Sequence, residues 1–259
     1  MPKPMIAAVL MLTALVVACA GEPEMAPDAA PVTTITTPNS TTTTFPPRPL
    51  YRGFEATGVD EGTLVVITGE EIPVYPEPGA DAPHITMPKS TILGTTTVLA
   101  TTGPPVDGWV EVMLPTRPNG STGWVPVEEI QMYVVSGRIV VDLSARELVY
   151  YLGDEELLRS PVAVGTARNP TPTGTYFVTD IVSMARSTGP WGPYAMGLSA
   201  RSDTITEFNG GDGIIGIHGT NRPGSIGQAA SLGCVRLPND TITLLHSMVP
   251  IGTPVEIKA

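Results

Sequence analysis

The sequence has few of the residues that metal sites, disulfide frameworks and nucleic-acid interfaces need. Among 259 residues there are two cysteines and three histidines, and only 15% of the residues are charged. Two cysteines allow at most one disulfide, and the one Cys and one His that lie together in residues 218–240 do not make a zinc site. No basic tract is present, so nucleic acid is not expected as a partner.

The chain also lacks an apolar run long enough to span a membrane. Residues 5–18, MIAAVLMLTALVVA, lie behind a short segment that contains Lys3. A transmembrane helix needs about 20 apolar residues, whereas a run of this length fits the apolar region of a secretion signal. We therefore predict a signal peptide over residues 1–18 and a mature protein outside the cytoplasm.

The end of this run, Val16-Val17-Ala18-Cys19, resembles the lipobox of bacterial lipoproteins. That resemblance implies that Cys19 becomes the N-terminus and carries acyl chains, which would anchor the protein in the membrane. The alternative is an ordinary signal peptide cleaved nearby. In either case Cys234 has no disulfide partner within the chain, so a free thiol is expected in an oxidising compartment.

A Pro- and Thr-rich segment follows and separates the N-terminus from the rest of the chain. Residues 19–50 hold seven prolines and almost no large apolar residues, which is typical of a disordered linker. Charge also divides the chain, because residues 1–135 carry 5 Lys/Arg and 14 Asp/Glu (−9) and residues 136–259 carry 9 and 11 (−2). We predict two domains, over residues 51–133 and 134–259.

Both domains are predicted to be mostly β. Residues 51–133 contain short β-branched runs cut by Gly, Pro and Asn, with a hairpin over residues 108–125, and the arrangement resembles the small SH3-like β-barrels often found beside cell-wall enzymes. The second domain repeats this pattern from residue 137. Its one helical stretch is residues 239–249, with Asn239 or Asp240 as the N-cap.

Two short motifs in the second domain carry a specific resemblance. IHGT at 217–220, followed by SLGCVRL at 231–237, is similar to the signature of the L,D-transpeptidase catalytic domain, and NPTPTGTY at 169–176 is also typical of that family. The family crosslinks bacterial peptidoglycan. The resemblance implies a β-sandwich catalytic domain with one or two short helices after the SH3-like β-barrel.

The residues of these motifs also make chemical sense by themselves. Cys234 is the candidate nucleophile and His218 its base, and a neighbouring positive group is expected to lower the pKa of a thiol. Gly233 allows a close approach of backbone to substrate. Its amide and that of Cys234 are the candidate oxyanion-hole donors.

The resemblance adds further site residues. The main-chain carbonyl of Gly219 would orient His218. Ser231, Arg236 and Tyr194 are the candidate substrate-binding residues, with Ser231 also bracing the nucleophile turn. The Arg236 guanidinium would receive a substrate carboxylate or instead form a salt bridge with Asp240.

The function implied is an acyl transfer between peptidoglycan stem peptides through a Cys234 thioester. A tetrapeptide donor would release D-alanine, and the acyl group would pass to a third-residue side-chain amine. The alternatives are an L,D-carboxypeptidase that hydrolyses the same bond and a catalytically silent wall-binding lipoprotein. Two other cysteine-enzyme families are disfavoured by the order and spacing of His218 and Cys234, because papain-like proteases place Cys before His and sortases have a longer His–Cys separation. No cofactor or metal is expected, and carbapenem β-lactams are expected to acylate Cys234.

Overall fold

The computed structural model describes residues 63–67, 70–208 and 210–259 of the chain. The predicted signal peptide, the lipobox with Cys19 and the linker over 19–50 lie outside these residues. Within the described part, no helix has both the length and the apolar character needed to cross a bilayer.

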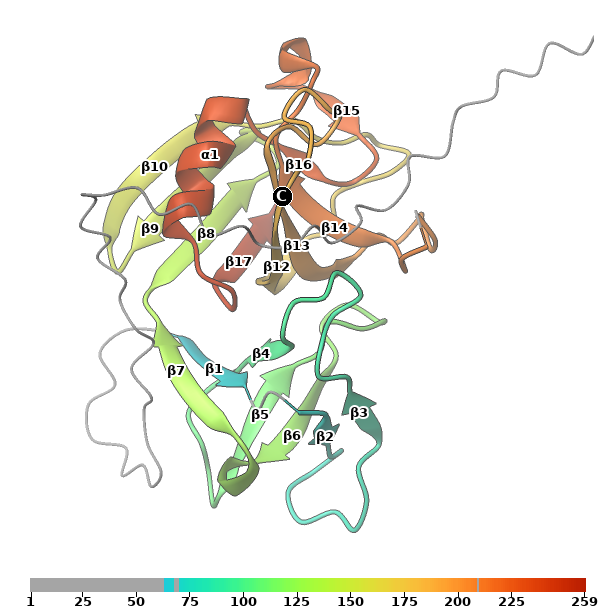
Figure 1. The fold of residues 1–259 in the computed structure, drawn as a ribbon, viewed down its shortest axis with the longest axis vertical. Helices are drawn as coiled ribbons and strands as arrows, with labels where there is room; N and C mark the ends of the chain where they lie inside the picture. Colours follow the sequence, from blue (N-terminus) through green and yellow to red (C-terminus); the bar gives the residue numbers. More distant parts are fainter. Residues whose placement is uncertain (1–62, 68–69, 209) are drawn as a thin grey trace, which may run out of the picture. The chain divides into compact units, whose positions relative to one another are not determined.

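An N-terminal module is built from seven short strands and one 3₁₀ turn (Figure 1). These are β1 (Thr63–Ile67), β2 (Ile72–Val74), β3 (Ile85–Met87), β4 (Val98–Ala100), β5 (Trp109–Met113), β6 (Thr122–Pro126), η1 (Val127–Glu129) and β7 (Gln131–Val135). The strands pair as a β4-β1-β7 sheet and as the hairpins β2-β3 and β5-β6. The hairpin predicted over residues 108–125 is confirmed, whereas the SH3-like assignment stays a prediction.

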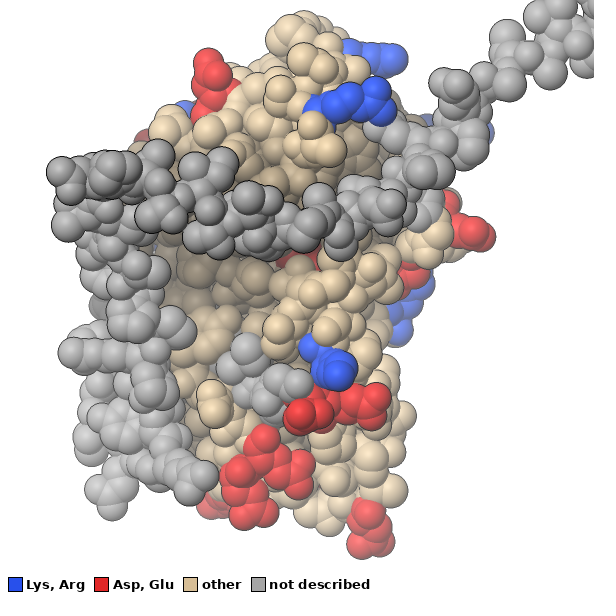
Figure 2. Space-filling view, in the orientation of Figure 1, with Lys and Arg blue, Asp and Glu red and all other residues tan. Residues whose placement is uncertain are grey.

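The module has its own apolar core and an acidic surface. Alternate residues of its strands are fully buried, among them Ile72, Val74, Val110 and Val112. Figure 2 shows acidic side chains gathered over this module on the face drawn. Its last strand, β7, ends at Val135, two residues beyond the domain boundary expected from the sequence.

The second part of the chain forms one eight-stranded sheet with a helix against it (Figure 1). Its elements are β8 (Gly137–Asp142), β9 (Glu147–Leu152), β10 (Glu155–Pro161), β11 (Val164–Gly165), β12 (Gly174–Ser183), β13 (Tyr194–Arg201), β14 (Ile214–His218), η2 (Pro223–Ser225), β15 (Ala229–Ser231), β16 (Val235–Arg236), α1 (Asn239–Met248) and β17 (Pro254–Lys258). The strand order is β10-β9-β8-β17-β12-β13-β14-β16, and β11 pairs separately with β15. The mostly β prediction is confirmed.

The long strand β12 joins the two halves of this sheet. Its first four residues, 174–177, pair with β17, and residues 178–183 pair with β13, with a bulge between Val178 and Asp180. Apolar residues of both halves share a single core, so the predicted sandwich is formed by one sheet that folds over on itself.

Helix α1 was predicted within one residue of its observed end, but its N-cap differs from the expectation. Pro238 occupies the N-cap position, and no side chain caps the helix. The carboxamide oxygen of Asn239 instead accepts the Thr220 N–H at 2.8 Å. The expected cap is therefore wrong, because Asn239 holds the loop that follows β14.

The two faces of the β12–β14 region have different neighbours. Ile215 and Ile217 of β14 face the core beneath α1. Ile214, Gly216 and His218 alternate with them and so lie on the opposite face. On this second face Phe177 is fully buried in the core of the N-terminal module.

Polar contacts from the tip of the β5–β6 hairpin reinforce this packing. The Arg117 guanidinium donates to the carbonyls of Ser202 (2.8 Å) and Asp212 (2.9 Å). The Asn119 carboxamide forms two hydrogen bonds with the backbone of Arg201, each 2.8 Å long. The module thus holds the segment between β13 and β14.

Candidate active site

His218 and Cys234 are brought together by parallel pairing of the two strands that carry them. Ile217 pairs with Val235 and His218 with Arg236, so Cys234, immediately before β16, lies opposite Gly216. The Cys234 sulfur accepts the Gly216 N–H at 3.4 Å. Two residues that are far apart in the sequence therefore come to lie on adjacent strands.

His218 is held in one orientation by a backbone carbonyl and an aromatic ring. Its Nδ1 lies 2.6 Å from the Gly219 oxygen, which is the position that the family resemblance implied for the orienting group. The Trp191 ring stacks on the imidazole. Only 6% of His218 is exposed, and burial lowers its pKa to about 4 although the Gly219 bond opposes the shift. At neutral pH the ring is therefore an uncharged base. The Gly219 carbonyl engages its Nδ1 and not its Nε2.

The thiol of Cys234 is protonated in the resting protein. Burial raises its pKa, against the opposing influences of the Gly216 N–H bond and the Arg236 charge. A lowered thiol pKa was expected from the sequence, and the structure gives the opposite direction because desolvation outweighs the nearby charge. Among the described residues, no hydrogen bond joins His218 to Cys234.

Two hydroxyl groups brace the turn that carries the nucleophile. Ser231 Oγ accepts the Gly233 N–H at 3.1 Å and donates to the Cys234 carbonyl at 2.5 Å. Thr171 Oγ1 accepts the Gly165 N–H and donates to the Gly233 carbonyl at 2.7 Å. Sequence reasoning placed Ser231 at this turn but missed Thr171, although the residue lies inside the quoted NPTPTGTY motif.

The backbone conformation at position 233 favours glycine, and a side chain there would also displace the end of a neighbouring side chain. The φ of Gly233 is +123°, and a Cβ there would lie 2.9 Å from the Ile215 side chain. Its N–H is already engaged by Ser231. Of the two amides expected as oxyanion donors, that of Cys234 is consequently the better placed to meet a substrate.

The loop between β12 and β13 closes over the histidine through two touching glycines. A Cβ on Gly219 would lie 2.5 Å from the Asn239 oxygen and 2.9 Å from the Gly192 Cα. Gly192, with φ +64°, has no room for a side chain either. This close approach places the neighbouring Trp191 on the ring of His218.

The two remaining candidate substrate contacts have different surroundings. Tyr194 stacks on His246 of α1 with ring centroids 3.9 Å apart, so its ring face is used within the protein. Arg236 is half-buried, and its Nε is buried without a hydrogen-bond partner among the described residues. In the same part of the chain Arg236 forms no ion pair with Asp240.

A metal site would need a cluster of ligands. No group of three or more His, Cys, Asp or Glu side chains in the described residues is arranged to hold a metal ion. The groups that meet around the nucleophile are a thiol, an imidazole and backbone amides, and together they suit acyl transfer through a covalent intermediate.

Comparison with known proteins assigns this constellation to one family. The model of the L,D-transpeptidase catalytic domain matches residues 136–257. YkuD of Bacillus subtilis (strain 168), which is named as an L,D-transpeptidase, is 36% identical over 126 residues, or 49% of this chain and 68% of that protein. ErfK/SrfK of Escherichia coli (strain K12), also named as an L,D-transpeptidase, is 30% identical over 161 residues, but only 51% of its length is covered.

Solved structures give a weaker likeness. L,D-transpeptidase 3 from Mycobacterium tuberculosis, in complex with a faropenem-derived adduct, matches with a TM-score of 0.40 and 16% identity over 63% of this chain and 91% of that one. The family assignment rests on the sequence matches.

Proposed function

We propose that this chain, which belongs to the L,D-transpeptidase catalytic-domain family, crosslinks peptidoglycan stem peptides through a thioester at Cys234. The observation that carries the proposal is that the His218 imidazole is neutral, buried and held in one orientation. It lies on β14 two residues after Gly216, whose N–H bonds the Cys234 sulfur. Such an arrangement suits a base that accepts a thiol proton only when substrate is bound.

The first half-reaction forms the acyl-enzyme. His218 takes the proton of Cys234, and the sulfur attacks the carbonyl between the third residue of a tetrapeptide donor and its terminal D-alanine. The C–N bond breaks as the imidazolium returns the proton to the leaving nitrogen. A C–S bond has replaced the amide, and D-alanine is released.

The second half-reaction transfers the acyl group. The side-chain amine of another stem's third residue attacks the thioester, His218 accepts its proton, and the thiol is restored. Since Gly233 N–H is engaged by Ser231, the Cys234 amide stabilises the oxyanion in both steps. One such donor typically contributes about 3 kcal/mol to the transition state.

Arg236 is the group we assign to a substrate carboxylate. Arg236 is half-buried and forms no ion pair within the described residues, and an Arg side chain binds a carboxylate through paired N–H donors. Ser231 acts by holding the turn and Tyr194 by packing against α1, so neither needs to touch substrate directly.

The location of the protein follows from residues outside the described part of the chain. We propose a lipoprotein anchored through Cys19, with the linker over 19–50 placing the catalytic domain at the cell wall. Replacing Cys19 with Ala should release the protein from the membrane fraction. Unchanged membrane association would reject the anchor and leave the catalytic proposal intact.

The reaction is tested with tetrapeptide-bearing muropeptides and mass analysis of the products. Wild-type protein should release D-alanine and form dimers linked between third residues, whereas Cys234→Ser should form none. Release of D-alanine with only tripeptide products, even with abundant acceptor amine, would instead identify a carboxypeptidase. No turnover, together with no acylation of Cys234 by a carbapenem, would identify a silent wall-binding protein.

A further inference from the structure

The peptide group between Gly219 and Thr220 forms a hydrogen bond at each of its two ends. Its carbonyl, on Gly219, lies 2.6 Å from Nδ1 of His218. Its N–H, on Thr220, donates to the side-chain oxygen of Asn239 at 2.8 Å. Thr220 is 4% exposed and His218 6%, so both bonds are shielded from water. One peptide group therefore lies between the candidate base and a side chain of α1.

The chemistry of these groups fixes the direction of each hydrogen bond. A backbone N–H can only donate, so the atom that meets Thr220 is the carboxamide oxygen of Asn239. A carbonyl can only accept, so Nδ1 of His218 carries a hydrogen and Nε2 of the neutral ring has the lone pair. Donation runs in one direction, from the imidazole to the peptide group and from the peptide group to Asn239.

Hydrogen bonds in such a series strengthen one another. When the peptide N–H donates to Asn239, the carbonyl of the same peptide group becomes a better acceptor, by about 10–30% per bond. The gain is larger once His218 is protonated, because a charged donor forms a stronger hydrogen bond. Asn239 is thus placed to stabilise the imidazolium that forms when His218 accepts a proton.

Asn239 also lies against the loop that covers the base. A Cβ on either Gly192 or Gly219 would collide with the Asn239 side-chain oxygen, so both glycine backbones pack on this one atom. Trp191, the neighbour of Gly192, stacks on the imidazole of His218. A single carboxamide therefore supports the groups that hold the edge and the face of the ring.

The start of α1 is fixed relative to β14, which places Asn239 beside the base. Leu237 is fully buried, and its N–H donates to the His218 carbonyl at 2.8 Å. Asn239 follows two residues later as the first residue of α1. The Thr243 hydroxyl donates to the Asn239 carbonyl at 2.8 Å. The backbone of Asn239 is consequently held to the strand that carries His218.

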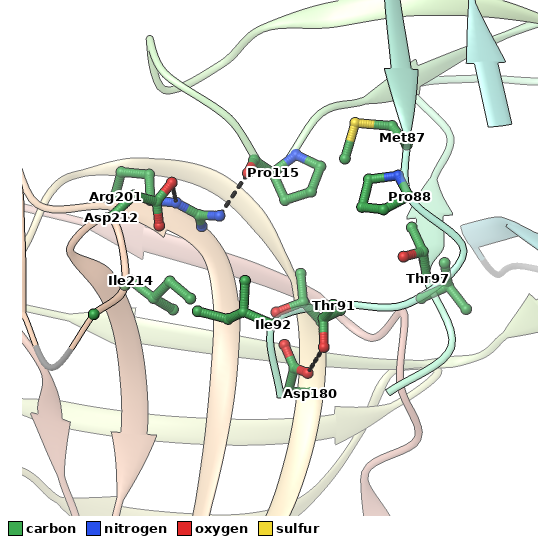
Figure 3. Close-up of a pocket in the computed structure, with 14 residues that line it drawn as sticks. Met87, Pro88, Thr91, Ile92, Thr97, Pro115, Asp180, Arg201, Asp212 and Ile214 are labelled. Atoms are coloured by element: carbon green, nitrogen blue, oxygen red, sulfur yellow. Dashed lines mark hydrogen bonds and ion pairs between the residues drawn. The ribbon is translucent and has the colours of Figure 1, made fainter. Parts of the chain in front are cut away.

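Within the described ranges, no carboxylate supports His218 in this way. Arg236 is the only charged group there that acts on the pKa of His218, and it lowers that pKa. The carboxylates labelled in Figure 3 have other partners, Asp180 in the Thr91 hydroxyl and Asp212 in the Arg201 guanidinium. The Nδ1 atom of the imidazole is therefore held by the peptide group alone.

We infer that Asn239 is a positioning residue for the catalytic pair, His218 and Cys234, and that it acts on His218 through the Gly219–Thr220 peptide group. It keeps the hydrogen of the neutral imidazole on Nδ1, which leaves the lone pair of Nε2 to accept the thiol proton. It also stabilises the imidazolium. This inference rests on the proposed function, because it adds a member to the group that activates the thiol.

Two variants separate the side-chain oxygen from its packing. Asn239→Ala removes the acceptor of the Thr220 N–H, so acylation of Cys234 by a carbapenem should slow about three- to tenfold, the range for one hydrogen bond. Asn239→Asp keeps an acceptor oxygen on a side chain of the same shape, so the rate at pH 7 should stay close to wild type. The matched control is Asp240→Asn, which exchanges the same two groups at the next, exposed position and should leave acylation unchanged.

The pH profile reports an effect that packing alone does not produce. Asn239→Asp brings a negative charge to the peptide group, so the pKa of His218 should rise from about 4. Since only the neutral ring accepts a proton, the acid limb of acylation should move to higher pH. The other titratable side chains of the adjoining segments stay the same in this variant, namely Arg186, Tyr194, Arg222, Cys234, Asp240 and His246.

The tautomer of His218 is measured without any reaction. In ¹⁵N NMR spectra the wild type should carry its imidazole hydrogen on Nδ1, and Asn239→Ala should show a larger share of the form protonated at Nε2. The chain has three histidines, and His218→Gln identifies the signals that belong to His218.

The outcomes decide this role separately from the proposed reaction. Equal slowing in Asn239→Ala and Asn239→Asp, with the pKa and tautomer of His218 unchanged, would overturn the inference and leave Asn239 as a packing residue. A wild-type rate in Asn239→Ala would overturn it as well. If thermal melting shows Asn239→Ala to be unfolded, the pKa of His218 in Asn239→Asp decides. The expected shifts in a protein that forms no peptide product would support the positioning role and reject the transpeptidase.

Discussion

The Trp191 indole lies over the His218 imidazole, with ring centroids 5.3 Å apart and 25° between the ring planes. The contact exists because Gly192, the next residue, packs directly against Gly219. It shields the imidazole from water, and burial is the main reason that the pKa of His218 is about 4. The aromatic ring that covers His218 is therefore Trp191, whereas the aromatic residue favoured from sequence, as a substrate contact, was Tyr194.

Removal of the Trp191 ring should change the pH profile of acylation. Trp191→Ala exposes His218, so its pKa should rise from about 4 toward the ordinary value of 6.5. Because only the neutral ring accepts a proton, acylation of Cys234 by a carbapenem should then decline between pH 7 and pH 5, where the wild type still reacts. Trp191→Phe keeps an aromatic cover and should retain the wild-type acidic limb. An equal loss at all pH values in Trp191→Ala would show that the ring acts on something other than the pKa.

The buried His218 should also make folding stability depend on pH. Its pKa is lower in the folded state, about 4, than the ordinary 6.5 of the unfolded state, so the unfolded chain binds more protons between these values. The free energy of unfolding should be fully retained above pH 6.5 and decrease as the pH falls toward 4. Urea unfolding at pH 7 and pH 5 measures the change. His218→Gln should show a smaller difference between the two pH values, and an identical difference would contradict the assignment.

Loss of the braces under the nucleophile should affect both stability and rate. Ser231→Ala leaves the Gly233 N–H and the Cys234 carbonyl without their partner, and Thr171→Val does the same to the Gly233 carbonyl. Each should lower the free energy of unfolding by about 1–3 kcal/mol, the usual effect of a buried unsatisfied group. Acylation should slow by at least tenfold, since the nucleophile moves. Ser247→Ala, at an exposed serine of α1, is the matched control, and normal acylation in the Ser231 and Thr171 variants would contradict this role.

A side chain at position 219 should disturb the loop that covers the histidine. Gly219→Ser places a Cβ against both the Asn239 oxygen and the Gly192 backbone, and the second contact cannot be relieved by a side-chain rotation. We expect lower thermal stability and a displaced Trp191, visible as a change in indole fluorescence. Gly224→Ser, where a Cβ meets open space, provides the comparison. Unchanged fluorescence in Gly219→Ser would mean that the loop does not depend on the glycine contact.

Local patterns in the sequence predicted most of the strands and the helix. Alternating β-branched residues mark β8, β9 and β12 to β14, and the spacing of Ile242, Leu245 and Val249 marks α1. The HG and SLGCVR motifs located His218 and Cys234 because the two segments meet through short parallel pairing. In each case the signal lies within a few consecutive residues.

The remaining features depend on segments distant in sequence. The cap of α1 was mistaken because the Asn239 side chain is used by Thr220, nineteen residues earlier. The direction in which the Cys234 pKa shifts depends on how deeply the thiol is buried, and a local sequence motif does not encode burial. Thr171 and Trp191 act through partners that are far along the chain, Gly233 and His218. Tertiary packing decides these features, and a single sequence does not display it.

Because β14 pairs with β16, the relative position of His218 and Cys234 does not depend on the length of the segment that connects them. Between them, η2 and its neighbours project outward, and a Cβ on Gly224 meets nothing within 4 Å. The backbone of Gly227 accepts a hydrogen bond from Arg146 and donates one to the Val162 carbonyl, which holds the return of this segment independently of its tip. The tip can therefore accept inserted residues, such as an epitope or a fluorophore site, a few residues from the catalytic pair in sequence without shifting either member of it.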